Sequence, residues 1–449
     1  MIDTAPAWWR PESGRTAAGA VALPAVTVAP TSSLAFWSLV AFTTILLLSP
    51  QIWFPILGSL RIAFLAAGLA IGAHLAHRLT QHEGAAPFFP EIAIAMALVG
   101  WSVLTLPLSY WPGGSMTVLT DHYLKAVAFF WLLGTLVTTT ARLRVLAWAL
   151  VLCSIPLAAT GLNNYLSGGF LSTGVPGFRR IIGYKGGSGI AGNPNDLALM
   201  LNLIIPIAGV LLLDARRMAM RWLAGAALVL SAIAVIVTFS RAGFLTLAAT
   251  FVMFLVVLAR RRSPGKAAML LVAGISLLAF MPTGYADRLS TITDISADQT
   301  GSAEGRWQDF QIALDIVSRH PVIGAGIGQD ILAMNESRGR GWTSVHNAFL
   351  QYAVDLGLPG LALFVWLYLS CLRSARAVER YSARVPALRD LTHLAAGVQV
   401  ALIAFAVAAF FHPIAYQFYF FSVGGLAVAL KRAYVTESAA VAAARVQAS

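Results

Sequence analysis

Residues 197–213 read LALMLNLIIPIAGVLLL, a run that contains no charged side chain. Similar runs recur along nearly the whole chain of 449 residues, of which 58% are hydrophobic and only 11% are charged. A soluble domain carries roughly 25% charged residues, so this composition excludes a soluble globular protein. Since a helix that crosses a bilayer needs about 20 mostly apolar residues, the sequence predicts one membrane-embedded unit built of helices.

The fold class that we expect is an all-α polytopic membrane protein with about twelve transmembrane helices. Residues 34–432 would form the transmembrane unit, between a mobile tail at 1–33 and a second tail at 433–449. The first tail lacks a basic start, a clean apolar stretch and a cleavage site, so it does not resemble a signal peptide. The predicted spans are 34–49, 54–75, 88–108, 124–139, 145–161, 197–213, 222–239, 243–259, 267–281, 358–372, 391–411 and 416–430.

The distribution of basic residues predicts the orientation. With the N-terminal tail in the cytoplasm, the inner segments hold 20 basic residues and the outer segments hold 9. The positive-inside rule therefore places both termini in the cytoplasm and the two long loops, 162–196 and 282–345, outside. The second loop contains a predicted amphipathic helix at 306–319. The net charge of +12 is mostly explained by topology, so nucleic acid is not an expected partner.

Several kinds of chemistry lack their usual sequence patterns. Gly187, Gly189 and Gly192 match G-x-G-x-x-G, but no strand precedes them and no βαβ unit surrounds them. The chain has no P-loop, no H-E-x-x-H, no G-x-S-x-G and no D-x-D pair, and its two cysteines, Cys153 and Cys371, offer no metal cluster. We therefore expect no metal and no cofactor.

Arginines on the outer side are the first candidate functional residues. Arg241 stands in TFSRAGF at a tight outer turn, Arg306 precedes the amphipathic segment, and Arg180 lies in a cluster with Arg179 and Lys185. Outer arginines oppose the positive-inside trend, and a guanidinium binds phosphate oxygens with a rigid fork of donors. The alternatives are an interfacial arginine that extends to water, a solvated helix face and a flexible charged loop.

The segment SVHNAFLQYAVDLGLPG contains the candidate base, His346. Asn347, Gln351 and Asp355 follow at a spacing of four residues, so we expect them to share one face of a short helix that begins with His346. Gly357 and the residues after it should interrupt this helix. Histidine is the commonest general base at neutral pH, although a lone surface histidine is usually only a hydrogen-bonding or capping residue.

Three other histidines compete for that role. His412, in FHP at another outer turn, is the main rival, and His122 and His320 are weaker candidates.

Four segments, GNPNDLALMLNL, VTFSRAGFL, GRWQDFQIALDIVSRHPVIGAGIGQ and HNAFLQYAVDLGLPG, resemble the O-antigen ligase superfamily. The superfamily includes O-antigen ligases, some O-antigen and exopolysaccharide polymerases, and protein O-oligosaccharyltransferases. The resemblance covers roughly Gly183 to Leu372, and it is the order of the segments, with a large loop before the HN pair, that is specific.

The resemblance implies a metal-independent, inverting membrane glycosyltransferase of the GT-C type with a large periplasmic loop, in the bacterial inner membrane. The donor would be a glycan on undecaprenyl pyrophosphate, presented among membrane lipids at the periplasmic face. By motif, Arg241 and Arg306 would hold the pyrophosphate, and His346 would act on the acceptor hydroxyl. Charge alone adds Arg180.

Three further residues are possible supporting members of the site. Asn347 follows the candidate base, and Asn195 and Asp196 match a family motif together with Asn193. Helix capping explains Asn193, Asn195 and Asp196 at least as well.

The expected reaction is that of an O-antigen ligase with lipid A–core as acceptor. A polymerase that uses a second lipid-linked repeat is the main alternative, followed by a protein O-oligosaccharyltransferase. A secondary transporter or flippase would also have many spans, but it would show repeats and ionisable residues near mid-membrane.

The first prediction concerns topology and follows from the uneven distribution of basic residues. Reporter fusions after Arg262 and Arg384 should report the cytoplasm, and a fusion near Asp298 should report the periplasm. A cytoplasmic signal at Asp298 would contradict the orientation, because the candidate site would then face away from the donor.

Overall fold

The computed structural model describes residues 32–81, 89–171, 180–184, 191–278, 281, 285, 302–339 and 342–448. All regular secondary structure in these residues is helical, which agrees with the predicted all-α class. The tail predicted at 1–33 lies, apart from its last two residues, outside the described part of the chain.

The first half of the bundle contains short and long helices in alternation. Its elements are α1 (Ser33–Leu48), η2 (Pro50–Ile52), α2 (Pro55–Ser59), α3 (Ile62–Thr80), α4 (Pro90–Thr105), η3 (Leu106–Leu108), α5 (Pro112–Val118), η4 (Leu119–Tyr123), α6 (Leu124–Leu136) and α7 (Thr140–Leu166).

The second half contains the most buried helix and the longest ones. Its elements are α8 (Pro194–Asp214), α9 (Met218–Val237), α10 (Arg241–Arg260), α11 (Pro264–Leu278), α13 (Ser302–Arg319), α14 (Asp330–Arg338), α15 (Ala348–Ser382), η6 (Pro386–Leu388), α16 (Arg389–Ala409) and α17 (Phe418–Ala448).

Eight helices of the described chain are long and apolar enough to cross a membrane: α3, α4 with η3, α7, α8, α9, α10, α15 and α16 with η6. The helices α1 and α11 are apolar but shorter. Each of the twelve predicted ranges overlaps a helix, yet the count of about twelve crossings stays a prediction. The protein is thus a multi-pass membrane protein of helical class.

Two predicted boundaries differ from the structure. The range 54–75 is not one helix, because Arg61 adopts a left-handed conformation (φ 47°) between α2 and α3, next to the weak helix formers Gly58 and Ser59. Arg61 is therefore exposed at a break and not inside a span. The tail predicted from 433 also differs, since α17 continues to Ala448.

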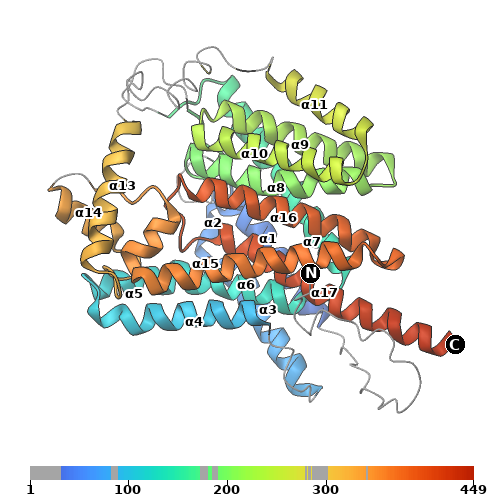
Figure 1. The fold of residues 1–449 in the computed structure, drawn as a ribbon, viewed down its shortest axis with the longest axis horizontal. Helices are drawn as coiled ribbons and strands as arrows, with labels where there is room; N and C mark the ends of the chain where they lie inside the picture. The colour runs from blue at the N-terminus through green and yellow to red at the C-terminus, as the bar shows by residue number, and fades with distance from the viewer. Residues whose placement is uncertain are drawn as a thin grey trace, which may run out of the picture.

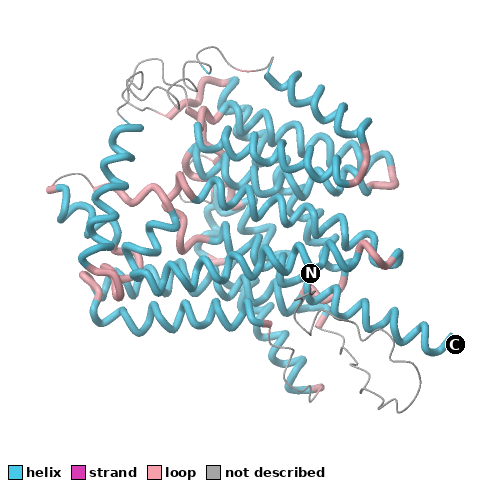
Figure 2. Tube along the Cα trace, in the orientation of Figure 1, coloured by secondary structure: helices cyan, strands magenta, loops and turns pink. Residues whose placement is uncertain are grey.

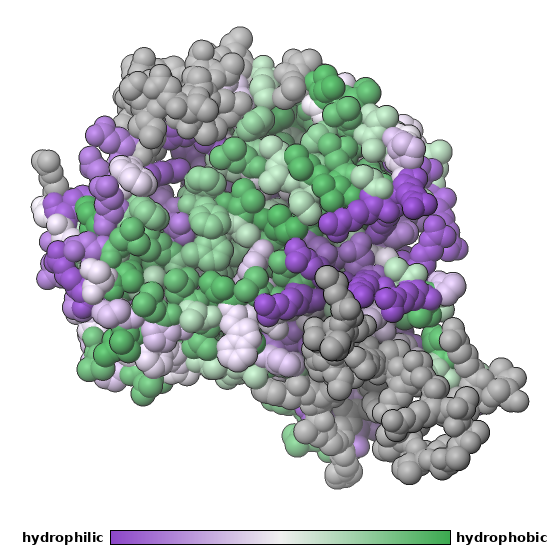
Figure 3. Space-filling model, viewed as in Figure 1, coloured by the Kyte–Doolittle hydropathy of each residue, from purple (hydrophilic) through white to green (hydrophobic). Residues whose placement is uncertain are grey.

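The helices lie side by side, with α8 packed between α9 and α16, and α17 packed against α6 and α15 (Figure 1). The helices α13 and α14 lie together at the left end of this view, whereas the turns that follow α8, α10 and α15 lie at the right end (Figure 2). Hydrophobic side chains cover the middle of this face and hydrophilic ones gather at both ends (Figure 3). That banding is expected of a bundle surrounded by lipid.

A buried ion pair joins three helices. Lys431 of α17 is fully buried and donates to both carboxylate oxygens of Glu91 in α4, at 3.0 and 2.9 Å. Ser374 of α15 also donates to Glu91. Such a pair contributes little net stability, but removal of one partner leaves an uncompensated buried charge.

The second prediction tests this pair. Lys431→Met should lower the free energy of unfolding by about 3–5 kcal/mol, because Glu91 would remain buried without its cation. The double variant Glu91→Leu with Lys431→Met should recover most of that loss. Stability would be followed by thermal unfolding of the purified protein in detergent.

The exposed pair between Lys125 and Asp121, at 3.4 Å, provides the control. Lys125→Met should change stability by no more than about 1 kcal/mol. Equal losses for Lys431→Met and Lys125→Met would contradict a structural role for the buried pair.

Candidate functional site

A pocket of about 310 Å³ lies where the first turn of α10, the first half of α13, the start of α15 and the end of α16 meet. Its charged and polar lining comes from Arg241, Arg306, Asp309, His346 and Asn347. The apolar lining consists of Ala242, Leu245, Trp307, Phe310, Val345, Leu350, Phe410 and Phe411.

The pocket brings together four of the residues singled out in the sequence. Arg241 is the first residue of α10, Arg306 lies near the start of α13, and His346 and Asn347 directly precede α15. Two guanidinium groups therefore face the same hollow as the imidazole. Two cations beside a neutral imidazole can bind an anion and accept a proton in one place.

The immediate surroundings of His346 include an acidic residue, Asp309, that was not among the candidates from the sequence. The Nδ1 atom of His346 lies 3.8 Å from Oδ2 of Asp309, whose carboxylate is held by Arg338. A second hollow of about 240 Å³ is lined by Arg306, Asp309, Arg338 and His346 together. Asp309 lies three residues after Arg306 and thus on the same face of α13, which is the signal that could have identified it.

The protonation state of His346 follows from this setting. Burial, together with the neighbouring charges of Arg306 and Arg338, lowers the pKa of His346 to about 4. The imidazole is therefore neutral at pH 7, as a group that is to accept a proton must be.

The segment that carries His346 is anchored by a buried carboxylate. Oδ2 of Asp330 accepts hydrogen bonds from the backbone N of Val345, at 2.9 Å, and from the hydroxyl of Ser344. Oδ1 of the same group accepts from Nε2 of Gln351, at 3.3 Å. Burial raises the pKa of Asp330, and these hydrogen bonds act in the opposite direction. The two residues before His346 are thus fixed to α14 and α15.

The face predicted for Asn347, Gln351 and Asp355 exists, although the helix begins later than expected. His346 and Asn347 precede α15, and the Asn347 side chain caps it by accepting from the backbone N of Leu350, at 3.1 Å. The helix is interrupted at Gly357 (φ 68°), as predicted, where a Cβ atom would overlap the carbonyl of Val322. The expectation that His346 starts the helix is therefore wrong, because Asn347 occupies the capping position.

Besides the pattern at residues 187–192, the chain has a glycine-rich segment at 324–328, and this segment has a structural role. The backbone N of Gly326 donates to the Asp355 carbonyl at 2.8 Å, and the backbone N of Gly328 donates to the Asp355 carboxylate at 3.0 Å. Gly326 has φ 102°, and a Cβ atom there would overlap Ser109. The glycines allow a close packed turn, which agrees with rejecting a nucleotide motif on sequence grounds. Gly187 and Gly189 lie outside the described residues.

Arg180 and Asn195 do not line the pocket, but they stabilise the start of α10, the helix that carries Arg241. Nη2 of Arg180 donates to Oδ1 of Asn195 at 2.7 Å, and the Ser240 hydroxyl donates to the same oxygen at 2.8 Å. Ser240 caps α10 by accepting from the backbone N of Gly243, at 3.1 Å. The pair Arg180–Asn195 thus stabilises the start of the helix that carries Arg241. Arg179 and Lys185 lie outside the described residues.

Asp196 belongs to a helix cap. Asn193 accepts from the backbone N of Asn195 and of Asp196, both at 2.9 Å, and its amide donates to the Asp196 carboxylate. This is the capping role that the sequence left open beside a functional one.

His412, the main alternative candidate for the general base, lies close to His346 in the structure. It is 3% exposed, and burial lowers its pKa to about 4, with the charges of Arg306, His346 and Arg180 acting in the same direction. Its Nδ1 hydrogen bonds to the Ala408 carbonyl at 2.9 Å, so Nδ1 carries the proton. His412 therefore lies close to the same site as His346. A His412 variant is for this reason not a suitable control for a His346 variant.

The outer face of α13 carries an apolar stripe next to the pocket. Trp307 is 58% exposed and stacks on Phe310 at 5.6 Å between ring centroids, and Leu314 continues the stripe one turn later. The predicted amphipathic helix is confirmed, with Asp309 and Ala313 on its buried side. Amphipathic aromatic rings are favoured at the interface between membrane and water.

Residues 226–365 match a family described as O-antigen ligase. The matched segment contains Arg241, Arg306, His346 and Asn347, and the resemblance inferred from the sequence is confirmed over this range. None of the curated proteins matches the chain. The match supports, at a coarse level, an enzyme of the membrane glycan ligase and polymerase class, which acts on lipid-linked glycans.

The third prediction concerns the imidazole of His346. Its pKa near 4 means that its reactivity toward diethyl pyrocarbonate, which modifies neutral imidazole, should stay constant from pH 8 down to about 5. The modified peptide would be quantified by mass spectrometry. A midpoint near 6.5, the value of an unperturbed histidine, would contradict the described environment.

Proposed function

We propose that this protein is an O-antigen ligase that transfers a glycan from undecaprenyl pyrophosphate to a hydroxyl acceptor, lipid A–core, at the periplasmic face of the inner membrane. The observation that carries the proposal is that Arg241, Arg306 and His346, which all belong to the matched segment, face one pocket. The proposal includes metal independence, a GT-C type of fold and inversion at the anomeric carbon.

The two arginines would bind the leaving group. As the glycosidic bond breaks, negative charge grows on the lipid pyrophosphate, and fixed guanidinium groups stabilise that charge. The pocket walls on the other side are apolar, with Phe410, Phe411 and Leu245 facing the same volume. Low polarity near the arginines strengthens their attraction for the anion.

The histidine would activate the acceptor. The acceptor oxygen attacks the anomeric carbon while the bond to the pyrophosphate oxygen breaks, and the hydroxyl proton passes to His346. Attack from the face opposite the leaving group inverts the anomeric centre. Asp309, 3.8 Å from Nδ1, would stabilise the imidazolium that forms. A bound pyrophosphate would raise the pKa of His346 and so make it a stronger base.

A polymerase that uses a second lipid-linked repeat as acceptor is the alternative, because both reactions need the same donor site. A protein O-oligosaccharyltransferase would share it as well. A transporter is less consistent with this arrangement, because the polar groups just described gather at one end of the bundle.

The fourth prediction tests the roles in a deletion strain complemented with variants. His346→Ala should reduce transfer at least about 10²-fold while the protein remains folded and inserted. Arg241→Lys should also fail, because an ammonium cannot reproduce the guanidinium fork. With purified protein, the arginine change should weaken donor binding, whereas the histidine change should mainly lower kcat.

His320→Ala is the matched control, because His320 lies on the same outer segment, is exposed, and contacts Tyr110 away from the pocket. The lipid-linked glycans that accumulate in the deletion strain distinguish the acceptors. Long chains that remain on the lipid carrier indicate that the missing enzyme is a ligase, and accumulated single repeats indicate a polymerase. Full activity of His346→Ala would overturn the assignment of the base.

A further inference from the structure

A second, larger cavity lies at the other end of the bundle. It has a volume of about 690 Å³ and lies among the C-terminal ends of α8, α10 and α15 and the starts of α11 and α16. Arg241 opens α10 at the candidate site, and Arg261 directly follows the other end of the same helix and lines this cavity. Twenty helical residues span about 30 Å, so the two sites are separate.

The acidic residues of this cavity already have cationic partners. Asp214 of α8 is paired with His393 of α16, and Asp390 is paired with Arg144 of α7 at 2.8 Å. Arg261 lies 3.9 Å from Glu379. Both carboxylates that line the cavity thus already have a basic side chain of the bundle as partner.

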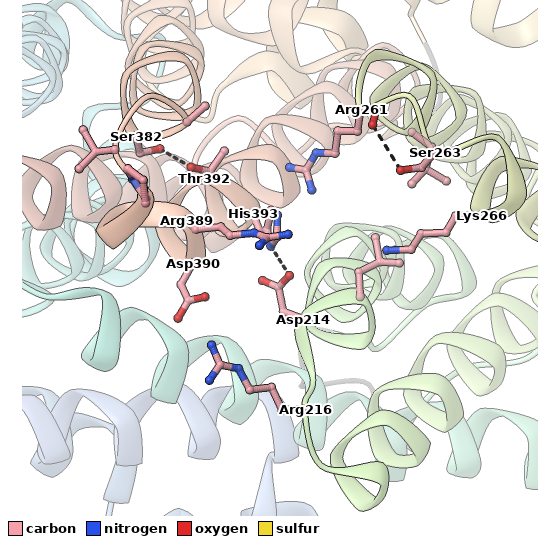
Figure 4. Close-up of a pocket in the computed structure, with 15 residues that line it drawn as sticks. Asp214, Arg216, Arg261, Ser263, Lys266, Ser382, Arg389, Asp390, Thr392 and His393 are labelled. Atoms are coloured by element: carbon pink, nitrogen blue, oxygen red, sulfur yellow. Dashed lines mark hydrogen bonds and ion pairs between the residues drawn. The ribbon is translucent and has the colours of Figure 1, made fainter.

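Three more cations line the same cavity. Arg216, Lys266 and Arg389 are exposed, and in the described part of the chain no acidic side chain pairs with them. Figure 4 shows Lys266 and Arg261 extending from the right-hand side of the view, and Arg389 and His393 facing them across the cavity. The cavity therefore has an excess of positive charge that no described residue neutralises.

A smaller hollow adjoins this cavity and adds a further basic residue. Its volume is about 310 Å³, it shares Asp214, Arg216 and Asp390 with the larger cavity, and it adds Arg217, Trp148 and Met220. Trp222, two residues after Met220 on α9, is 72% exposed.

An apolar helix face also lies beside the cavity. On α11, which begins next to Lys266, the side chains of Met269, Val272 and Ile275 are each about 60% exposed. A ligand that fits this surface needs a compact anionic group and an apolar part.

We propose that this cavity binds the phosphate headgroup of an anionic membrane lipid, whose acyl chains lie along the exposed apolar faces of α9 and α11. Guanidinium and ammonium groups bind phosphate oxygens through charge-assisted hydrogen bonds. Basic side chains near a membrane surface each contribute to the attraction for anionic lipids. An excess of basic residues on one side is general among membrane proteins. That excess would not by itself produce a cavity whose carboxylates are paired while three of its cations have no acidic partner among the described residues.

The fifth prediction uses the delipidated full-length protein in detergent. Titration with phosphatidylglycerol should raise the Tm, because a ligand that binds only the folded state stabilises it, and phosphatidylcholine should have no such effect. This comparison needs no variant. Equal stabilisation by both lipids would overturn the proposal, because the headgroup charge would then be irrelevant.

A triple variant locates the effect. Replacement of Arg216, Lys266 and Arg389 by Gln should weaken the apparent affinity for phosphatidylglycerol at least about tenfold. The matched control replaces Arg221, Arg373 and Arg376 by Gln, which removes the same charge from exposed positions outside the cavity. An equal loss in both triple variants would show that only net charge matters and would overturn the proposal.

Inorganic phosphate distinguishes the two possible sources of the anion. Stabilisation by millimolar phosphate alone, with none from phosphatidylglycerol, would assign the cavity to a soluble phosphate compound and overturn the lipid. Stabilisation by phosphatidylglycerol that added phosphate does not reproduce supports it.

Discussion

Two buried aspartate side chains hold the segment between α13 and α15 to the helical bundle. Asp355 of α15 accepts from the backbone of Gly328, and Asp330 of α14 accepts from the backbone beside His346. A buried carboxylate is costly unless hydrogen bonds satisfy it, so these groups hold the backbone in one arrangement. The position of the imidazole in the candidate site depends on that constraint.

Around this anchor, the candidate site concentrates positive charge in a place where membrane topology does not require it. Arg241 and Arg306 reach the same pocket from helices that are far apart in the sequence. The charges of Arg306 and Arg338 contribute, after burial, to the low pKa of His346. These charges suppress protonation of His346, and a bound anion would reverse this effect. Donor binding and activation of the base would thus be linked by electrostatics alone.

The two ends of the bundle share helices but differ in the state of their charges. At the end that holds the candidate site, Asn195 accepts from Arg180 and from Ser240 at the start of α10. At the opposite end Asp214 and Asp390 are paired, whereas Arg216, Lys266 and Arg389 have no acidic partner among the described residues. The same two helices, α8 and α10, connect both ends.

The sequence by itself determined the helical membrane class, the positions of most helices, the break at Gly357 and the choice of Arg241, Arg306 and His346. These follow from local rules, because apolar length, glycine conformation and unusual outer charges can be read along one chain. Only the tertiary structure decided that Asp309 and His412 lie beside His346, that Asn195 braces Arg180, and that Arg61 lies at a helix break. Those facts depend on contacts between segments distant in sequence, and hydropathy carries no information about which helix faces meet.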